Sequence, residues 1–217
     1  MISWVLHGAS TSKLADRILV ATDDERILKA VRASGFEAVM TSPNHPSGSD
    51  RVAEVASNLS ADIIVNLQGD EPTIDGSIID RLIAELCESS ADITTPVTSF
   101  SDAKEVESPN TAKVVVDENG YALYFSRSVI PFPRDGQIDP RNYLKHIGIY
   151  CYRRESLLKF VGYSPSKLEK IEKLEQLRAL ENGMRIRVVF TDYRSVPVDV
   201  PSDIHKAEKA LKDKGLC

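Results

Sequence analysis

The sequence predicts an α/β protein with a mainly parallel sheet that is flanked by helices. Short apolar runs alternate with amphipathic helical periods over the first hundred residues, and this order builds parallel sheets covered by helices. Residues 108–153 instead contain runs that alternate polar and apolar side chains, which predicts an antiparallel lobe. The length of 217 residues suits a single domain, 1–217, which is large enough to hold a core without disulfides.

The first half of the chain supplies four predicted strands with helices between them. The strands are expected at 17–23, 37–42, 63–68 and 92–100. A T-x-x-E capping box from Thr22 to Glu25 begins the first helix after a strand, and Gly35 ends it. Two further helices are expected at 52–59 and at about 76–89, from their apolar stripes.

The middle of the chain breaks this alternation. Residues 112–127 alternate by two around Asn119-Gly120, which is the strongest short signal for a hairpin. Residues 146–153 form a further apolar strand. These strands predict an antiparallel excursion, a part that α/β enzymes often use for dimerisation or for a second substrate.

Helix returns after this excursion. One helix is predicted over 164–183, with Ser164 as its cap, Pro165 in its first turn and Gly183 at its end. A strand and a terminal helix complete the chain, at 185–193 and from residue 202.

An amphipathic helix is also predicted at the start of the chain. Its apolar residues lie at i, i+3, i+4 and i+7, and they are Ile2, Val5, Leu6 and Ala9. No cap and no strand precede them, although the first helix of a doubly wound sheet follows a central first strand. The chain is therefore expected to enter its fold one strand late.

The overall composition argues against several classes of protein. A net charge of −5 argues against general nucleic-acid binding. No apolar run approaches the roughly 18 residues of a membrane span, and residues 1–9 lack the length and basic lead of a signal peptide. Cys87, Cys151 and Cys217 have no metal-ligand spacing, so we expect the reduced thiols of a cytoplasmic protein.

Two aspartates stand where ligands collect in α/β folds. Asp70 follows the strand 63–68 within "QGDEP", and Asp199 follows a strand within "VPVDVPSD". A carboxylate at a strand end can hold Mg²⁺ beside phosphates, and the alternative is a turn residue or the start of a helix. Two such residues at neighbouring strand ends could converge on one ion.

Two charged residues on predicted helices each have two possible roles. Arg51 lies in a first turn, where a cation opposes the helix dipole, so it either pairs with Asp50 or Glu54 or faces a nucleotide. Glu175 falls on the apolar edge of its predicted helix. It therefore needs either a partner such as Arg178 or the hydroxyl of a ligand.

A third group of candidates lies on the predicted antiparallel strands. Arg127 ends the hairpin, and His146 and Tyr150 stand four residues apart on one predicted strand, so that they share a face with Tyr152. The alternative is a half-exposed sheet face made of amphipathic side chains. The four histidines have no ligand spacing, and zinc is not expected.

Seven segments match one known family in order and spacing. They are "VATDDERI", "MTSPNHPSGSDRVAEV", "VNLQGDEP", "KVVVDENGYALYFSRSVIPFPR", "LKHIGIYCYRRESL", "SPSKLEKIEKLEQLRALENG" and "VDVPSD". Over nearly its whole length the chain thus resembles the 3-deoxy-manno-octulosonate cytidylyltransferases, or CMP-Kdo synthetases. The resemblance implies a Rossmann-like α/β fold of the nucleotide-diphospho-sugar transferase type.

The resemblance also implies a magnesium-dependent transfer that serves lipopolysaccharide synthesis. The anomeric hydroxyl of 3-deoxy-D-manno-octulosonate (Kdo) attacks the α-phosphate of CTP, and pyrophosphate leaves. By similarity, Asp70 and Asp199 hold Mg²⁺, and Arg51 and Gln68 lie near the cytidine. The residues matched to the sugar are Arg127 at its carboxylate and His146, Tyr150, Glu175 and Gln176 at its hydroxyls. A homodimer through the antiparallel excursion is implied as well.

One departure from the family accompanies the late entry into the fold. The family opens with a strand and a loop of the form "IPAR…STRLPGKPL", which cradles the triphosphate, and residue 1 aligns just after it. Two alternatives to an active CMP-Kdo synthetase follow from this. One is a non-catalytic remnant that binds the sugar, and the other is a cytidylyltransferase for another acidic sugar.

Overall fold

The computed structural model describes residues 1–198 and 200–213. Its helices are α1 (Ile2–Ala9), α2 (Glu25–Ala33), α3 (Gly48–Ser57), α4 (Gly76–Glu88), α5 (Ala103–Glu107), α6 (Arg154–Val161), α7 (Lys167–Glu172), α8 (Gln176–Glu181) and α9 (Ile204–Asp213), with short 3₁₀ turns at Pro140–Asn142 and Pro201–Asp203. Its strands are β1 (Leu19–Thr22), β2 (Glu37–Met40), β3 (Ile63–Asn66), β4 (Ile93–Ser99), β5 (Lys113–Val116), β6 (Ala122–Ser126), β7 (Leu144–His146), β8 (Tyr150–Arg153) and β9 (Ile186–Phe190).

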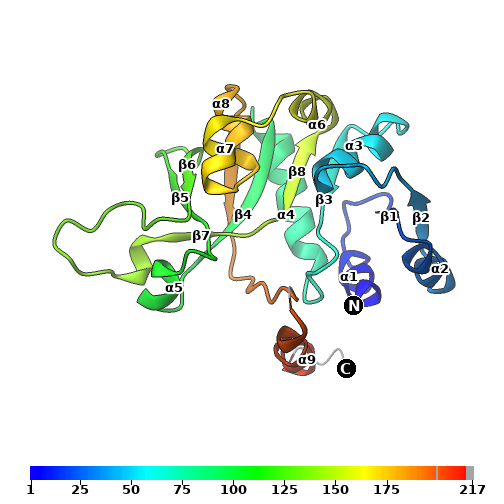
Figure 1. The fold of residues 1–217 in the computed structure, drawn as a ribbon, viewed down its shortest axis with the longest axis horizontal. Coiled ribbons are helices and arrows are strands. Elements are labelled where there is room, and N and C mark those ends of the chain that lie inside the picture. Colours follow the sequence, from blue (N-terminus) through cyan, green and yellow to red (C-terminus); the bar gives the residue numbers. More distant parts are fainter. Residues whose placement is uncertain (199, 214–217) are drawn as a thin grey trace.

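The α/β class with a central sheet between helices is confirmed, but the strand pairing differs from the prediction (Figure 1). In the described part of the chain, β1 pairs with β2 and β4 with β9 in parallel, and the other strand pairs are antiparallel. The prediction of a mainly parallel sheet is wrong because β8 runs between β3 and β4, and β7 between β4 and β5. The strands of the predicted antiparallel lobe therefore join the same sheet as β3 and β4.

β1 and β2 form a separate two-stranded sheet. Within the described residues, β1 pairs only with β2 and β3 pairs only with β8, so each has one edge without a neighbouring strand. The expectation that the chain enters its fold one strand late stays a prediction.

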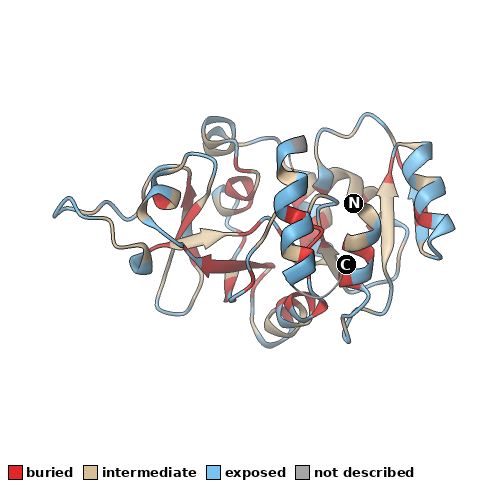
Figure 2. Ribbon diagram, turned by 90° about the horizontal axis from the view of Figure 1, so that it is seen from below, coloured by how far each residue is buried: buried red, intermediate tan, exposed pale blue. Residues whose placement is uncertain are grey.

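Helices cover both faces of the large sheet. One apolar cluster, which includes Ile93 and Val97, lies under α3, α6 and α8, and a second, which includes Ile149, lies under α4. Buried residues concentrate in the strands, while the outer sides of the helices are exposed (Figure 2). Within the described residues, no helix is both long and apolar enough to cross a membrane.

α1 packs against the loop that follows β3. A Cβ atom on Gly8 would lie 2.2 Å from the carbonyl oxygen of Ile74, so the two backbones approach as closely as glycine permits. Beyond α1, the carboxylate of Asp80 on α4 accepts hydrogen bonds from the hydroxyl of Ser12 and the backbone N–H of Lys13. The amino-terminal segment thereby supports the loop that carries Asp70.

Two predicted helix starts are wrong. The cap of α2 is Asp24, which accepts from the N–H of Arg26, whereas Thr22 belongs to β1 and accepts from the N–H of Asp24. The cap of α7 is Ser166, which forms a capping box with Glu169, and not Ser164. In both places a carboxylate or hydroxyl closer to the helix provides the better geometry for its free N–H groups.

The single helix predicted over 164–183 is two helices. Lys173 adopts a left-handed conformation with φ of 54° and ends α7. The guanidinium of Arg127 takes the carbonyl oxygens of Glu172 and Lys173 as acceptors, at 2.8 and 3.3 Å. These contacts divert the carbonyls from the helical hydrogen-bond ladder, so a tertiary interaction outweighs the local helical pattern.

Two of the cysteines lie in the described residues, and both are free thiols. Cys87 is exposed and Cys151 is buried in β8, where burial raises the pKa of its thiol to about 12. Cys217 lies outside the described residues.

Candidate active site

Two adjacent carboxylates follow β3 and have different surroundings. Glu71 is buried, and it accepts hydrogen bonds from hydroxyl groups in the segment 193–195. Asp70 is half-buried, and its carbonyl oxygen accepts the N–H of Val198 at 3.0 Å. The segment that leads to residue 199 therefore lies against the loop of Asp70, while Asp199 itself lies outside the described residues.

The donor set at the end of β3 suits a hard cation that also binds phosphate. Among residues 1–198 and 200–213 there is no cluster of three or more His, Cys, Asp or Glu side chains that could hold a metal by itself. Mg²⁺ at nucleotide sites is held by one or two carboxylates together with phosphates and water. Asp70 supplies one such carboxylate at a strand end, so the site fits Mg²⁺ bound with a nucleotide.

Arg51 bonds to residues that follow β1 and β2. Its guanidinium donates to the hydroxyl of Thr41 at 2.6 Å and forms an ion pair with Asp23 at 2.9 Å. The pairing with Asp50 or Glu54 that we considered is therefore wrong. The reason is that a side chain in the first turn of a helix points back toward the amino end, here toward the strand ends.

The amino end of α3 connects two candidate residues that are more than a hundred positions apart. On one side, the amide of Gln68 lies 3.4 Å from where a Cβ on Gly48 would be. On the other, the hydroxyls of Ser47 and Ser49 donate to the two carboxylate oxygens of Glu175, at 2.7 and 2.8 Å. The sequence analysis missed both serines, although the S-G-S spacing at the helix start was visible.

Glu175 and Gln176 begin α8, beyond the break at Lys173. Arg178 reaches Glu175 only at 3.5 Å and bonds mainly to Glu169, at 2.6 Å. The prediction that Glu175 lies on the apolar edge of one continuous helix is wrong, because α7 and α8 are separate helices. Gln176 is 4% exposed, and within the described residues its buried amide nitrogen has no hydrogen-bond partner. Such a group normally has a partner, so a ligand oxygen would complete it.

His146 and Tyr150 share one face but lie on two strands, so the single strand predicted over 146–153 is wrong. The chain bends between β7 and β8, where the hydroxyl of Thr95 donates to the carbonyl of Ile149 at 2.8 Å. The same hydroxyl lies 2.9 Å from Nε2 of His146, whose ring centroid is 5.5 Å from that of Tyr150. Burial lowers the pKa of His146 to about 3 and raises that of Tyr150 well above its ordinary value. Both side chains are therefore neutral at physiological pH.

The side chain of Arg127 is held by backbone carbonyl groups, and its own backbone carbonyl is held by a buried lysine. Its guanidinium donates to the carbonyl oxygens of Pro109, Glu172 and Lys173, at 2.8 to 3.3 Å. Three of its five N–H donors are thus used within the described residues. The ammonium of Lys113, which is fully buried, donates to the carbonyl of Arg127 at 2.5 Å. The sequence analysis missed Lys113, because nothing in a hairpin pattern marks a lysine as buried.

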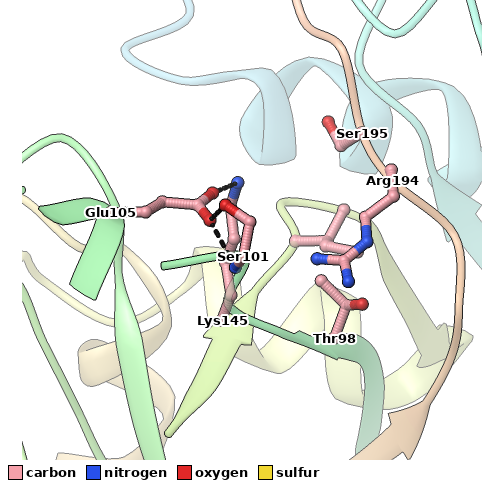
Figure 3. Close-up of a pocket in the computed structure, with 7 residues that line it drawn as sticks. Thr98, Ser101, Glu105, Lys145, Arg194 and Ser195 are labelled. Carbon is pink, nitrogen blue, oxygen red and sulfur yellow. Dashed lines mark hydrogen bonds and ion pairs between the residues drawn. The ribbon is translucent and has the colours of Figure 1, made fainter. Parts of the chain in front are cut away.

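A cavity of about 220 Å³ opens at the carboxyl end of β4 (Figure 3). It is lined by Thr98, Ser101, Glu105, Lys145, Ile147, Arg194 and Ser195, and it includes none of the predicted site residues. Lys145 and Glu105 form an ion pair at 2.5 Å inside it. Burial alone would raise the pKa of Glu105, but the hydrogen bonds from Lys145 and Ser101 lower it to about 2.

The structure joins most of the described candidates through direct contacts. Ser49, which binds Glu175, also accepts a hydrogen bond from the amide of Asn66 at 3.3 Å. Asn66 pairs with Tyr150, whose ring lies beside those of Tyr152 and His146. Arg127 holds the carbonyls of the turn that leads into Glu175. The amino end of α3 thus contacts both Gln68 and Glu175.

Comparison with known proteins identifies the family of the chain. Residues 1–186 match the family model described as Cytidylyltransferase. A 3-deoxy-manno-octulosonate cytidylyltransferase of Geotalea daltonii is 49% identical over 225 residues, which cover 99% of this chain and 89% of the relative. The protein of the same name from Geobacter sulfurreducens is 47% identical, with 98% and 89% covered.

Solved structures lead to the same family. A CMP:2-keto-3-deoxy-manno-octonic acid synthetase complexed with CTP is 39% identical, with a TM-score of 0.92 over 98% of this chain and 88% of that one. A 4-diphosphocytidyl-2C-methyl-D-erythritol synthase from Anaerococcus prevotii has a TM-score of 0.64 at 13% identity, over 97% and 88% of the two chains, and shares the fold alone. On these comparisons, the chain belongs to the 3-deoxy-manno-octulosonate cytidylyltransferase family.

Proposed function

We propose that this chain transfers CMP from CTP to the anomeric hydroxyl of Kdo and releases pyrophosphate. The names of its close relatives and the CTP bound in a similar structure support both substrates. The observation that carries the proposal is the amino end of α3, where Gln68 meets the helix start and where Ser47 and Ser49 hold Glu175. One helix end thus lies between a nucleotide side and a sugar side.

In this reaction the anomeric oxygen of Kdo forms a bond to the α-phosphorus of CTP. The bond from that phosphorus to the oxygen of the leaving pyrophosphate breaks, and the hydroxyl proton passes to water. Mg²⁺, when bound, stabilises negative charge on the phosphates and makes the hydroxyl more acidic. We propose Asp70 and Asp199 as the residues that hold it, because carboxylates at strand ends beside a nucleotide are the ligands that Mg²⁺ uses.

The sugar side provides groups of different charge for different parts of Kdo. Arg127 is a fixed cation whose two remaining N–H donors can bind the sugar carboxylate with a charge-assisted bond. Glu175 can accept from sugar hydroxyls, and the buried amide of Gln176 can donate to one. His146 and Tyr150 are neutral and contribute hydrogen bonds without charge.

On the nucleotide side, we propose that Arg51 and Gln68 contact the cytidine. Arg51 is fixed by Asp23 and Thr41 at the ends of β1 and β2, where ligands of α/β folds collect. Gln68 is exposed at the end of β3, and its amide offers both a donor and an acceptor. A base with a carbonyl and an amino group matches such an amide.

The proposal extends to assembly and cellular role. We propose a homodimer through the antiparallel excursion, which presents large exposed apolar side chains: Leu123 is 61% exposed and Phe132 is 82% exposed. We further propose that the enzyme acts in the cytoplasm and activates Kdo for lipopolysaccharide synthesis.

The experiment is an assay of pyrophosphate release by the purified protein with CTP, Kdo and Mg²⁺, with EDTA as the metal-free control. We expect release that requires all three components. Binding of Kdo by calorimetry without any release would instead favour a non-catalytic sugar-binding protein. Faster release with a sialic acid or with an amino variant of Kdo would favour another acidic sugar as the substrate.

A further inference from the structure

We propose that Glu71 is a positioning residue that ties the segment 191–198 to the loop of Asp70. This inference rests on the proposed function in one respect, because its effect on turnover concerns the transfer of CMP. The two neighbouring carboxylates would then have separate tasks. Asp70 faces the reaction, and Glu71 fixes the chain that leads to the second aspartate, Asp199.

The hydrogen bonds of Glu71 connect parts of the chain more than 120 positions apart. Oε2 accepts the phenol hydroxyl of Tyr193 at 3.0 Å, and both oxygens accept the hydroxyl of Ser195, at 2.6 and 2.7 Å. Glu71 is 6% exposed and Tyr193 is 8% exposed, so these bonds form away from water. A buried carboxylate is costly unless it is hydrogen-bonded, and the segment supplies these donors.

Two further contacts hold the same segment on either side of Ser195. The guanidinium of Arg194 donates to the carbonyl oxygen of Ser99 at the end of β4. The N–H of Val198 donates to the carbonyl oxygen of Asp70 at 3.0 Å. In Figure 3, Arg194 and Ser195 project from one stretch of chain, with Arg194 directed toward Thr98 in β4. A fifth contact is the N–H of Thr191, which donates to the carbonyl oxygen of Val97 at 2.9 Å. The segment is thus fastened at five of its residues, and two of these contacts use Glu71.

The donors around Glu71 favour a side chain with two acceptor oxygens at this position. Burial, and after it the charge of Glu71, raises the pKa of Tyr193, so the phenol stays protonated and donates. A glutamine at position 71 would present one oxygen instead of two and would add an N–H₂ group among hydroxyl donors. The change keeps the size of the side chain, so it tests the hydrogen bonds rather than the packing.

The experiment compares Glu71→Gln with a matched control at the other end of β4. Asp92 precedes that strand, and its carboxylate accepts from the hydroxyl of Ser156 and the N–H of Arg185, each at 2.9 Å. Asp92→Asn therefore also weakens a carboxylate that joins distant segments, but far from the loop of Asp70. Hydrogen exchange of the Val198 amide, Mn²⁺ affinity by paramagnetic resonance, and kcat and KM would be measured for both.

We expect exchange at Val198 to become at least tenfold faster in Glu71→Gln and to stay unchanged in Asp92→Asn. We also expect Mn²⁺ affinity and kcat to fall at least fivefold in Glu71→Gln only, with the KM for Kdo within twofold of its original value. If Glu71→Gln does not fold, the comparison uses Ser195→Ala and Tyr193→Phe in its place, because each removes one hydrogen-bond donor to Glu71.

Each contrary outcome overturns the proposal. Unchanged exchange at Val198 would show that Glu71 does not fasten the segment. Faster exchange with unchanged Mn²⁺ affinity and kcat would show that the contact is structural only. If the original protein transfers no CMP, the proposed function fails, but the exchange and Mn²⁺ measurements still decide the role of Glu71.

Discussion

The buried ammonium of Lys113 offers the sharpest test of how the sugar side is built. It donates to the carbonyl oxygens of Ser108, Thr111 and Arg127, at 2.9, 2.9 and 2.5 Å. Burial, and after it the charge of Arg127, lowers the pKa of Lys113. The substitution Lys113→Met keeps most of the side-chain volume but removes this donor from all three carbonyls. The carbonyl of Ser108 still accepts from the N–H and the hydroxyl of Thr111, at 3.3 and 3.0 Å.

The expected loss of stability follows from these contacts. A buried acceptor that loses its partner costs about 1–3 kcal/mol. Part of that cost is offset because methionine, unlike lysine, does not require a charged ammonium to be buried. We expect a net loss of about 3 kcal/mol in the free energy of unfolding. For a chain of this size, that loss lowers the melting temperature by roughly 6–12 °C. Because Lys113 fixes the carbonyl of Arg127, the KM for Kdo should rise several-fold while that for CTP stays nearly constant.

The assay is thermal unfolding followed by circular dichroism, together with steady-state kinetics on both substrates. Lys104→Met is the matched control, because Lys104 is exposed on the nearby helix α5. A melting temperature for Lys113→Met within a degree of the control would refute the reasoning about the buried carbonyls. Equal changes in KM for CTP and Kdo would refute the link to Arg127.

Three further predictions concern the metal, the sugar and a histidine. Asp70→Asn should abolish pyrophosphate release without changing the melting temperature, and full activity would rule out its metal role. Arg127→Ala should raise the KM for Kdo far more than that for CTP, and an equal effect would count against contact with the sugar carboxylate. The pKa of His146, about 3 when folded, lies below its unfolded value of about 6.5. Its contribution to stability is therefore complete above pH 6.5 and declines as the pH falls toward 3, and a midpoint near 6.5 in imidazole NMR would contradict this.

Local patterns in the sequence were sufficient to predict where most strands and helices lie. The period of two around Asn119-Gly120 predicted the β5–β6 hairpin, and the stripe of Ile2, Val5 and Leu6 predicted α1. Both are decided by residues close in sequence, which is why a local pattern suffices. The residues of the candidate site came instead from resemblance to a family, since isolated aspartates and arginines carry little information.

The secondary-structure predictions fail where a residue distant in the sequence changes the local structure. A helix over 164–183 is favoured by its own residues, but Arg127 takes the carbonyls of Glu172 and Lys173. The strand predicted over 146–153 bends at Gly148, and the next carbonyl, that of Ile149, accepts from Thr95 on β4. Neither partner could be identified from the segment alone, because each contact depends on which strands become neighbours.

The strand order explains why the sugar-side residues come so close to the metal loop. In a purely parallel sheet, β3 and β4 would be neighbours and the antiparallel strands would lie at an edge. Here β8 lies between them, and Tyr150 pairs directly with Asn66, the last residue of β3. Gln68 and Asp70 follow within four residues of that pair. The insertion that made the parallel prediction wrong therefore places Tyr150, and His146 beside it, next to the loop where we propose that CTP and Mg²⁺ bind.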